Sequence, residues 1–267
     1  MTEFEQLSDK YKTLKLSPTK EEHEQLKIEY VYHSNRLEGS NLTLIQTVDV
    51  IKHHKTSGEV SLVDMMMAVD HYRALNAAIS FGANKYPISE RILLSLHDTL
   101  LKNSFQIDPV YQSWIESGQE LGQFKVKANR IRTTINGTEE YFLTPDPEES
   151  RQLINESIEQ YGKSGDPFLV KLSKLVQNVY NAHAFFDGNK RMTRLIIANQ
   201  LTVNGYPLML PHASQNEYNE ALIRGFVDNT HEYILQVIER SFNQQLSAEI
   251  EKYNSAKKPN RGFGLII

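Results

Sequence analysis

One short stretch of this chain carries a clear β-strand pattern, and helical periodicity accounts for most of the rest. Two β-prone runs, residues 130–135 and 138–143, flank the dipeptide Asn136-Gly137. Asn-Gly between two such runs is typical of a tight β-hairpin turn. No internal repeat at a solenoid period and no low-complexity segment is present. The sequence therefore predicts an all-α fold with one inserted β-hairpin.

The helices before the hairpin follow from apolar spacing and from start signals. Ser17-Pro18 predicts the cap and first residue of a charged, amphipathic helix that continues to about Leu37. Apolar residues at three- and four-residue spacing predict a second helix over about residues 61–81. Ser89 is expected to cap a third helix.

The helices after the hairpin follow from similar signals. Asp146-Pro147 and Asp166-Pro167 each predict a capping residue followed by a proline at the helix start. The second of these helices is expected to end near Asn181. Further predicted segments are a helix over about 190–203, a helix capped by Ser214 that continues through Ile223, and a last helix over about 230–246.

Composition excludes several classes of protein. The net charge of −4 gives no basis for a nucleic-acid-binding or polybasic membrane-binding protein. The absence of cysteine excludes disulfides, thiol catalysis and cysteine zinc sites, and fits a reducing compartment. The charged N-terminus lacks the apolar stretch of a signal peptide, and no run approaches the roughly 18 apolar residues of a membrane helix. We expect a cytoplasmic protein with no membrane association and no direct nucleic-acid binding.

The most informative segment is residues 183–194, where one predicted helix ends, a loop follows and the next helix begins. The free backbone N–H groups at that helix start, helped by Gly188, form a natural anion site. Arg191 and Arg194 are three residues apart, so they project from the same side of the first turn. Two arginines beside free N–H groups suit a polyphosphate better than a single carboxylate.

Two further side chains in this segment supply the remaining chemistry. Asp187 offers a hard oxygen ligand to Mg²⁺, which typically takes one or two carboxylates together with phosphate oxygens and water. His183 is the only nearby side chain that accepts a proton near neutral pH. Each residue alone has an ordinary explanation as a helix cap, a turn or a solvated surface group. Together, at this spacing, they predict a phosphate-transfer site.

The same segment resembles the signature of the Fic family, His-x-Phe-x-(Asp/Glu)-Gly-Asn-x-Arg-x-x-Arg, at every fixed position. The matching residues are His183, Phe185, Asp187, Gly188, Asn189, Arg191 and Arg194. The resemblance covers about residues 30–240 and implies a Fic-type helical bundle in which the hairpin is the flap. It further implies three regions. Residues 1–85 form an N-terminal helical region that includes an inhibitory helix, residues 86–246 form the catalytic core, and residues 247–267 form a C-terminal tail.

The resemblance implies transfer of AMP from ATP to a Ser, Thr or Tyr hydroxyl of a target protein. His183 would be the general base that deprotonates the hydroxyl before it attacks the α-phosphate. Asp187 would hold Mg²⁺ across the α- and β-phosphates, and Phe185 would anchor the loop in the core. The residues that would bind phosphates are Gly188, Asn189, Arg191 and, at the γ-phosphate, Arg194.

Two positions depart from the commonest form of the signature. Ala184 stands where proline is frequent, which is expected to be harmless. Lys190 stands where glycine is frequent, and lysine also occurs there in the kinase-like Doc branch. That branch usually lacks the equivalents of Gly188 and Arg194. We therefore predict AMP transfer rather than phosphate transfer, with Lys190 among the nucleotide-binding residues.

The hairpin and a later helix supply further candidates. A flap strand can pair with an extended target segment through main-chain hydrogen bonds. Ile131, Arg132 and Thr133 are candidates for nucleotide or target contact on that strand, against the alternative of a simple surface hairpin. Tyr218 and Asn219 align with the nucleoside-pocket pair of the family, although two tyrosines are common there.

Residues 34–39 resemble the inhibitory motif of the family, (Ser/Thr)-x-x-x-Glu-(Gly/Asn), placed N-terminal to the core as in class II members. Taken alone, the segment is a helix that ends at a C-cap glycine. The resemblance implies that Ser34 and Glu38 form an inhibitory site. Glu38 would pair with Arg194, and so would remove the partner of the γ-phosphate.

Three functions remain open at this point. The first is a protein adenylyltransferase that also modifies itself. The second is removal of AMP from a modified protein, in which Glu38 would position water. The third is a regulatory binding module with an idle site. The target protein and the choice among ATP, UTP, CTP and GTP are not specified, and a homodimer is plausible by analogy with the family.

Overall fold

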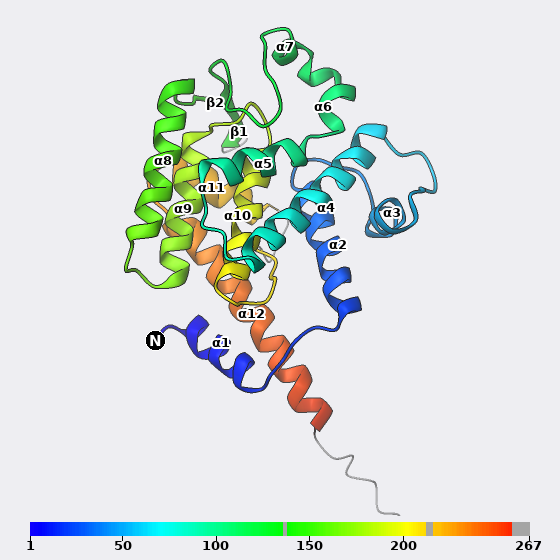
Figure 1. The fold of residues 1–267 in the computed structure, drawn as a ribbon, viewed down its shortest axis with the longest axis vertical. Coiled ribbons are helices and arrows are strands. Elements are labelled where there is room, and N and C mark those ends of the chain that lie inside the picture. Colours follow the sequence, from blue (N-terminus) through cyan, green and yellow to red (C-terminus); the bar gives the residue numbers. More distant parts are fainter. Residues whose placement is uncertain (136–137, 212–215, 258–267) are drawn as a thin grey trace, which may run out of the picture.

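The structure, a computed structural model, describes residues 1–135, 138–211 and 216–257. It is a helical bundle with one two-stranded antiparallel sheet, so the predicted all-α fold with an inserted hairpin is confirmed (Figure 1). In chain order the elements are α1 (Glu3–Thr13), α2 (Lys20–Arg36), α3 (Leu44–Val48), a π-helical turn (Asp49–His53), α4 (Leu62–Ala83), α5 (Glu90–Leu100), α6 (Ser104–Ile107), a 3-10 turn (Pro109–Tyr111), α7 (Gln112–Ile115), β1 (Arg130–Ile135), β2 (Thr138–Leu143), α8 (Pro147–Lys163), α9 (Phe168–Ala182), α10 (Asn189–Val203), α11 (Glu217–Val227) and α12 (Glu232–Lys257).

Helix α10 lies in the middle of the bundle, with α4, α5 and α9 packed around it (Figure 1). It is buried on nearly every side, which is typical of a central helix rather than of an amphipathic surface helix. Met192, Leu195 and Ile196 belong to one core cluster, together with residues of α4 and α5. Ile197 and Leu201 belong to a second, together with residues of α9, α11 and α12. The start of α10 is therefore fixed by both cores.

Several predicted helix starts are confirmed by their capping bonds. Ser89 caps α5, because its hydroxyl accepts the Ile92 N–H at 3.4 Å. Asp146 caps α8, because its carboxylate accepts the Glu149 N–H at 2.9 Å, with Pro147 at the first helical position. These contacts satisfy backbone donors that a helix start would otherwise leave unpaired.

The predicted start of α2 at Ser17-Pro18 was wrong, because a better cap follows it. The Thr19 hydroxyl accepts the Glu22 N–H at 3.1 Å, and the Glu22 carboxylate accepts the Thr19 N–H at 2.8 Å. Such a reciprocal capping box satisfies two backbone donors at once. The helix therefore begins at Lys20.

The predicted cap of α9 at Asp166 was also wrong. The Asp166 carboxylate accepts hydrogen bonds from the Ser164 hydroxyl at 2.9 Å and from the Lys174 ammonium at 2.7 Å. This carboxylate makes no capping bond to the helix backbone, and α9 begins at Phe168 with Pro167 as an N-cap that makes no side-chain bond.

The last helix is longer than the sequence analysis predicted. Instead of ending near Leu246, α12 continues to Lys257. Leu246 and Ile250 are both buried in the second core cluster, so the apolar face simply extends by another turn. The predicted cap at Ser214 and residues 258–267 lie outside the described residues.

An N-terminal helix that the sequence analysis did not predict packs against α12 (Figure 1). Thr2 and Glu5 form a capping box at the start of α1. Phe4 is buried between the rings of Tyr206 and Phe242. The Thr-x-x-Glu signal was present in the sequence, and the aromatic contacts give the short helix a docking site.

The two strands of the hairpin pair in a single antiparallel register, from Arg130 opposite Leu143 to Ile135 opposite Thr138. Two residues connect them, which agrees with the predicted short turn, although Asn136-Gly137 itself lies outside the described residues. Among the helices in the described ranges, none has the length and apolar character required to cross a membrane.

The close approach of α4 to α10 depends on Gly82. A Cβ atom at this position would lie 2.7 Å from the backbone oxygen of Asn199 and 2.7 Å from the Thr202 Cβ. We expect Gly82→Ala to destabilise the protein by about 1–3 kcal/mol, because a packed core cannot accept the extra atom without shifting. Denaturant unfolding measures the change. Gly162→Ala in α8 is the matched control, since nothing lies within 4 Å of its Cβ position, and it should stabilise by about 0.5–1 kcal/mol. Equal effects would contradict this account of the contact.

Candidate active site

The residues predicted to carry chemistry meet where α9 gives way to α10, around a loop of residues 183–188 that we call the junction loop. His183 ends α9 in the left-handed conformation, with φ of 42°. Gly188 precedes α10 with φ of 77° and makes no side-chain cap bond. The first N–H groups of α10 therefore have no side-chain cap, and they lie where the sequence predicted an anion site.

Gly188 is required at its position for two reasons. Its positive φ is a conformation that other residues adopt at a cost. In addition, a Cβ atom there would lie 3.2 Å from the Leu100 Cδ2 atom. The sequence analysis predicted the glycine from its place in the motif, and the structure shows the steric reason for it.

The junction loop is held in place by side chains that contact its backbone. The Asn189 amide accepts the Phe185 N–H at 3.1 Å and donates to the Phe185 carbonyl at 2.8 Å. The Asn189 side chain is thus occupied with the loop, so any phosphate contact here would involve its backbone N–H. Phe185 is buried and stacks on the His97 ring at 4.2 Å, which is the anchoring position expected of it.

His97 is a supporting residue that the sequence analysis missed. Burial lowers its pKa to about 4, so the imidazole is neutral. Its Nε2 lies 3.2 Å from the backbone oxygen of Asp187 and donates to it, because a carbonyl can only accept. No local signal in α5 distinguishes this histidine from an ordinary core residue.

The His183 imidazole lies beside Tyr180, with the ring centroids 5.8 Å apart in a T-shaped arrangement. Burial and the nearby Lys125 ammonium lower the pKa of His183 to about 4. Its Nδ1 is buried and has no hydrogen-bond partner among the described residues. The ring is therefore neutral at pH 7, the form that can accept a proton.

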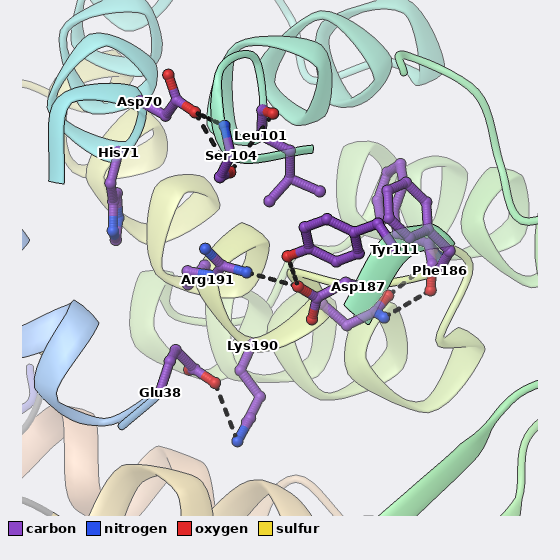
Figure 2. A network of polar contacts seen from close by, with 12 residues as sticks. Glu38, Asp70, His71, Leu101, Ser104, Tyr111, Phe186, Asp187, Lys190 and Arg191 are labelled. Carbon is purple, nitrogen blue, oxygen red and sulfur yellow. Dashed lines mark hydrogen bonds and ion pairs between the residues drawn. The ribbon is translucent and has the colours of Figure 1, made fainter. Parts of the chain in front are cut away.

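Asp187 is placed by two donors, both on its Oδ2 atom (Figure 2). The Tyr111 hydroxyl donates at 2.6 Å and the Arg191 guanidinium at 2.8 Å. Burial alone would raise the pKa of Asp187, but Arg191, Tyr111 and the Gly188 N–H together lower it. Tyr111 was not predicted, because it lies in a short turn far away in the sequence with no motif of its own.

Arg194 is completely buried, and its guanidinium is surrounded by acceptors. Its Nε donates to the Ser34 hydroxyl at 2.6 Å, and one terminal nitrogen donates to the Ser34 carbonyl at 3.2 Å. The same terminal nitrogen forms an ion pair with Glu38 Oε1 at 2.5 Å. The contact between Glu38 and Arg194 that the sequence analysis expected is therefore present.

Glu38 also binds a second cation, which the sequence analysis did not anticipate. The Lys190 ammonium lies 3.2 Å from Glu38 Oε2 (Figure 2), so each carboxylate oxygen has its own positive partner. Burial alone would raise the pKa of Glu38, but Lys190, Arg194 and Arg191 lower it to about 2. Glu38 is therefore ionised across the physiological pH range.

The predicted nucleoside-pocket pair lies against Arg194 and the turn that carries Glu38. Tyr218 is buried, and the Arg194 guanidinium lies over its ring, 5.6 Å from the ring centroid. The Tyr218 hydroxyl donates to the Thr193 hydroxyl at 2.9 Å. Asn219 accepts from Arg194 at 3.4 Å and donates to the Leu37 carbonyl at 3.0 Å. Asn219 thus contacts directly the turn that carries Glu38.

The hairpin candidates point in different directions. Ile131 is buried in the second core cluster, whereas Thr133 is half-buried. Arg132 is exposed and forms a cross-strand ion pair with Glu139. Of these three candidates, Arg132 is therefore the exposed, charged one, and Ile131 serves the core.

The comparisons with known proteins agree with this arrangement. The sequence profile of the Fic/DOC family matches residues 87–201, a span that contains the junction loop and most of α10. A protein adenylyltransferase Fic from Drosophila willistoni is 26% identical over 220 residues, which cover 74% of this chain and 38% of that protein. The chain thus spans well under half the length of this relative.

Solved structures share the fold. A Fic domain-containing signaling protein from Bacteroides thetaiotaomicron superimposes with a TM-score of 0.79 at 24% identity, covering 95% of this chain and 97% of the other. Fic-1 from C. elegans gives a TM-score of 0.68 at 18% identity, covering 93% and 69% of the two chains. The profile match shows a Fic/DOC domain over residues 87–201, and the described fold is shared with solved Fic structures.

Proposed function

We propose that this chain transfers AMP from ATP to a hydroxyl group of a target protein, and that Glu38 inhibits the transfer. The observation that carries the proposal is the excess of positive charge at the start of α10. Lys190, Arg191 and Arg194 all act on the single Glu38 carboxylate, beside backbone N–H groups that have no side-chain cap. Such a site suits a triphosphate. The adenylyltransferase name of the fly relative supports the same reaction class.

The transfer would join the target hydroxyl oxygen to the α-phosphorus of ATP and break the bond from that phosphorus to the bridging oxygen of the β-phosphate. Pyrophosphate leaves with that oxygen. The hydroxyl proton goes to the neutral imidazole of His183, which stands at the edge of the junction loop. The N–H groups of α10 and the guanidinium of Arg191 bind the phosphates and stabilise the charge that develops.

The residues present also fit a Mg²⁺ ion. Within the part of the chain that the structure describes, no group of three or more His, Cys, Asp or Glu side chains could hold a metal ion. Asp187 would thus be the protein ligand, and phosphate oxygens and water would complete the shell, as is usual for Mg²⁺. Both side-chain donors to Asp187 use Oδ2, so Oδ1 has no side-chain donor and would be the oxygen that holds the ion. When bound, Mg²⁺ would neutralise charge on the phosphates.

The inhibition follows from competition for the same cations. A γ-phosphate would need Arg194 and Lys190, and the Glu38 carboxylate occupies both. ATP must therefore displace Glu38 or bind without these partners. The Asn219 amide strengthens the inhibited state, because it holds the backbone of the turn at Leu37.

Replacing Glu38 with glycine should activate the protein. We expect Glu38→Gly to raise auto-modification by labelled ATP at least about tenfold, which needs only about 1.4 kcal/mol of relieved competition. The variant should also unfold more easily without ATP, because it leaves Arg194 buried and unpaired at a cost of about 3–5 kcal/mol. ATP should restore thermal stability more in the variant than in the wild type.

The control for this variant is Glu59→Gly, which removes an exposed glutamate from a loop. It should leave both activity and the ATP-induced thermal shift unchanged. Full and equal activity of the wild type and Glu38→Gly would exclude the inhibitory role. Release of AMP from a modified target by the wild type would instead favour hydrolytic removal of AMP as the function.

The role of His183 can be separated from nucleotide binding. In the Glu38→Gly background, His183→Ala should lower AMP transfer by about 10²–10⁴-fold, the usual contribution of a general base. ATP affinity measured by calorimetry should stay nearly constant, since the phosphate-binding groups lie on α10. Undiminished transfer by the double variant would reject His183 as the base.

The protonation of His183 is itself measurable. Burial and the Lys125 ammonium lower its pKa to about 4, so the ring should stay neutral until the pH falls to that value. An NMR titration of the imidazole Cε1 proton, assigned by its absence in His183→Ala, checks this. Adding ATP to Glu38→Gly should move the midpoint upward, because phosphate charge favours the imidazolium. An apo midpoint near 6.5 would contradict the burial of the ring.

A further inference from the structure

Lys125 is a buried lysine whose direct partners are all neutral. It lies in the segment between α7 and β1 and is 2% exposed. Its ammonium donates to the Asn129 Oδ1 at 3.1 Å and to the Thr144 hydroxyl at 2.9 Å. Lysine is almost never this buried unless a carboxylate pairs with it. Burial lowers the pKa of Lys125 to about 8, and the acids that act on it, Asp146 and Glu149, do so only from a distance.

The partners of Lys125 stand at the open end of the hairpin. Asn129 immediately precedes β1, and Thr144 immediately follows β2. The Thr144 N–H donates to the Asn129 carbonyl at 3.3 Å, and the Thr144 hydroxyl lies 2.5 Å from the Asn129 Oδ1. The Lys125 ammonium therefore contacts the residues that flank both strands, and it links the two strands at the open end of the hairpin.

The same group of residues also contacts the backbone of the junction loop. The Lys125 N–H donates to the Ala184 carbonyl at 2.9 Å. The Asn129 amide donates to the Phe185 carbonyl at 3.1 Å and to the Phe186 carbonyl at 3.5 Å. These carbonyls lie between His183 and Asp187 in the chain. The position of the hairpin and the position of the loop are thus set by one set of hydrogen bonds.

We propose that Lys125 is a positioning residue that fixes the hairpin relative to the junction loop, and so places a target segment paired with the hairpin against His183. The proposal rests on the proposed AMP transfer, in which the hairpin binds the target. A charged donor suits this task, because its hydrogen bonds are stronger than those of a neutral group. A purely structural lysine would affect stability and all substrates alike, whereas a positioning lysine affects the protein acceptor selectively.

The charge of Lys125 also acts on the base. It lowers the pKa of His183, together with burial and Lys190, while Asp187 acts in the opposite direction. The Tyr180 ring packs against the His183 ring in a T-shaped arrangement. This effect agrees with a lysine that faces the reacting centre as well as the hairpin.

The test compares Lys125→Met with Lys127→Met, both in the Glu38→Gly background. Lys127 lies in the same segment, but its ammonium donates to the Ser113 carbonyl at 3.0 Å and the Ser117 hydroxyl at 2.8 Å, away from the hairpin. ATP affinity is measured by calorimetry. The kcat and KM of the transfer are measured with a protein acceptor that a lysate labelling screen has identified. Amide hydrogen exchange is followed over β1 and β2.

We expect Lys125→Met to raise the acceptor KM and lower its kcat/KM by about tenfold, the loss of a charge-assisted hydrogen bond. ATP affinity should stay within about twofold of the parent, and amide exchange over the strands should accelerate by about tenfold. Lys127→Met should change none of these quantities. If Lys125→Met fails to fold, Thr144→Val removes the hydroxyl and keeps the ammonium, and should give the same pattern.

Unchanged exchange over β1 and β2, or a parallel loss of ATP affinity and acceptor turnover, would overturn the proposal. Its failure is distinguishable from failure of the proposed function. If Glu38→Gly transfers no nucleotide at all, the AMP transferase assignment fails, and the exchange comparison still decides whether Lys125 anchors the hairpin.

Discussion

The guanidinium of Arg194 is fully buried, and the need to neutralise it organises the structure around it. An unpaired charge at such a depth would be strongly destabilising, so the cation must always have an anionic partner. In the resting protein that partner is Glu38, supported by the Ser34 hydroxyl and carbonyl. The phosphate of a nucleotide is the natural alternative. In the proposed function, inhibition and substrate binding would therefore be two ways to satisfy one buried charge.

The precision of the site depends on the packing of α10. Because this helix contributes to both core clusters, its first turn cannot tilt without disturbing α4 and α5 on one side or α9 and α12 on the other. The junction loop is then fixed by contacts to its backbone from His97, Asn129 and Asn189. Packed helices fix the positions of the proposed phosphate-binding groups, and short polar contacts fix the loop between the helices. This is the arrangement that preorganised sites require.

Local signals were sufficient for much of this structure. The hairpin, most helix starts and the cluster of motif residues could be predicted because their causes lie within a few residues of each other in the chain. Predictions failed where two local signals competed, as with Ser17 and Thr19, or where the predicted capping group bound other side chains, as Asp166 binds Ser164 and Lys174. The supports of the site, among them Tyr111 and Lys125, could not be predicted. They reach it through tertiary contacts that no spacing in the sequence encodes.

The packing of α1 against α12 has a consequence for how inhibition is relieved. Helix α2 is held upstream by this docked helix and downstream by its contacts with α3 and α4. In the proposed function, Glu38 would thus be an intramolecular inhibitor, present at a high effective concentration that dilution of the protein cannot reduce. Relief then requires only a local swing of the turn after α2, not the departure of a whole segment. The proposed switch should respond to any partner that displaces that turn, and Glu38 should return to Arg194 when the partner dissociates.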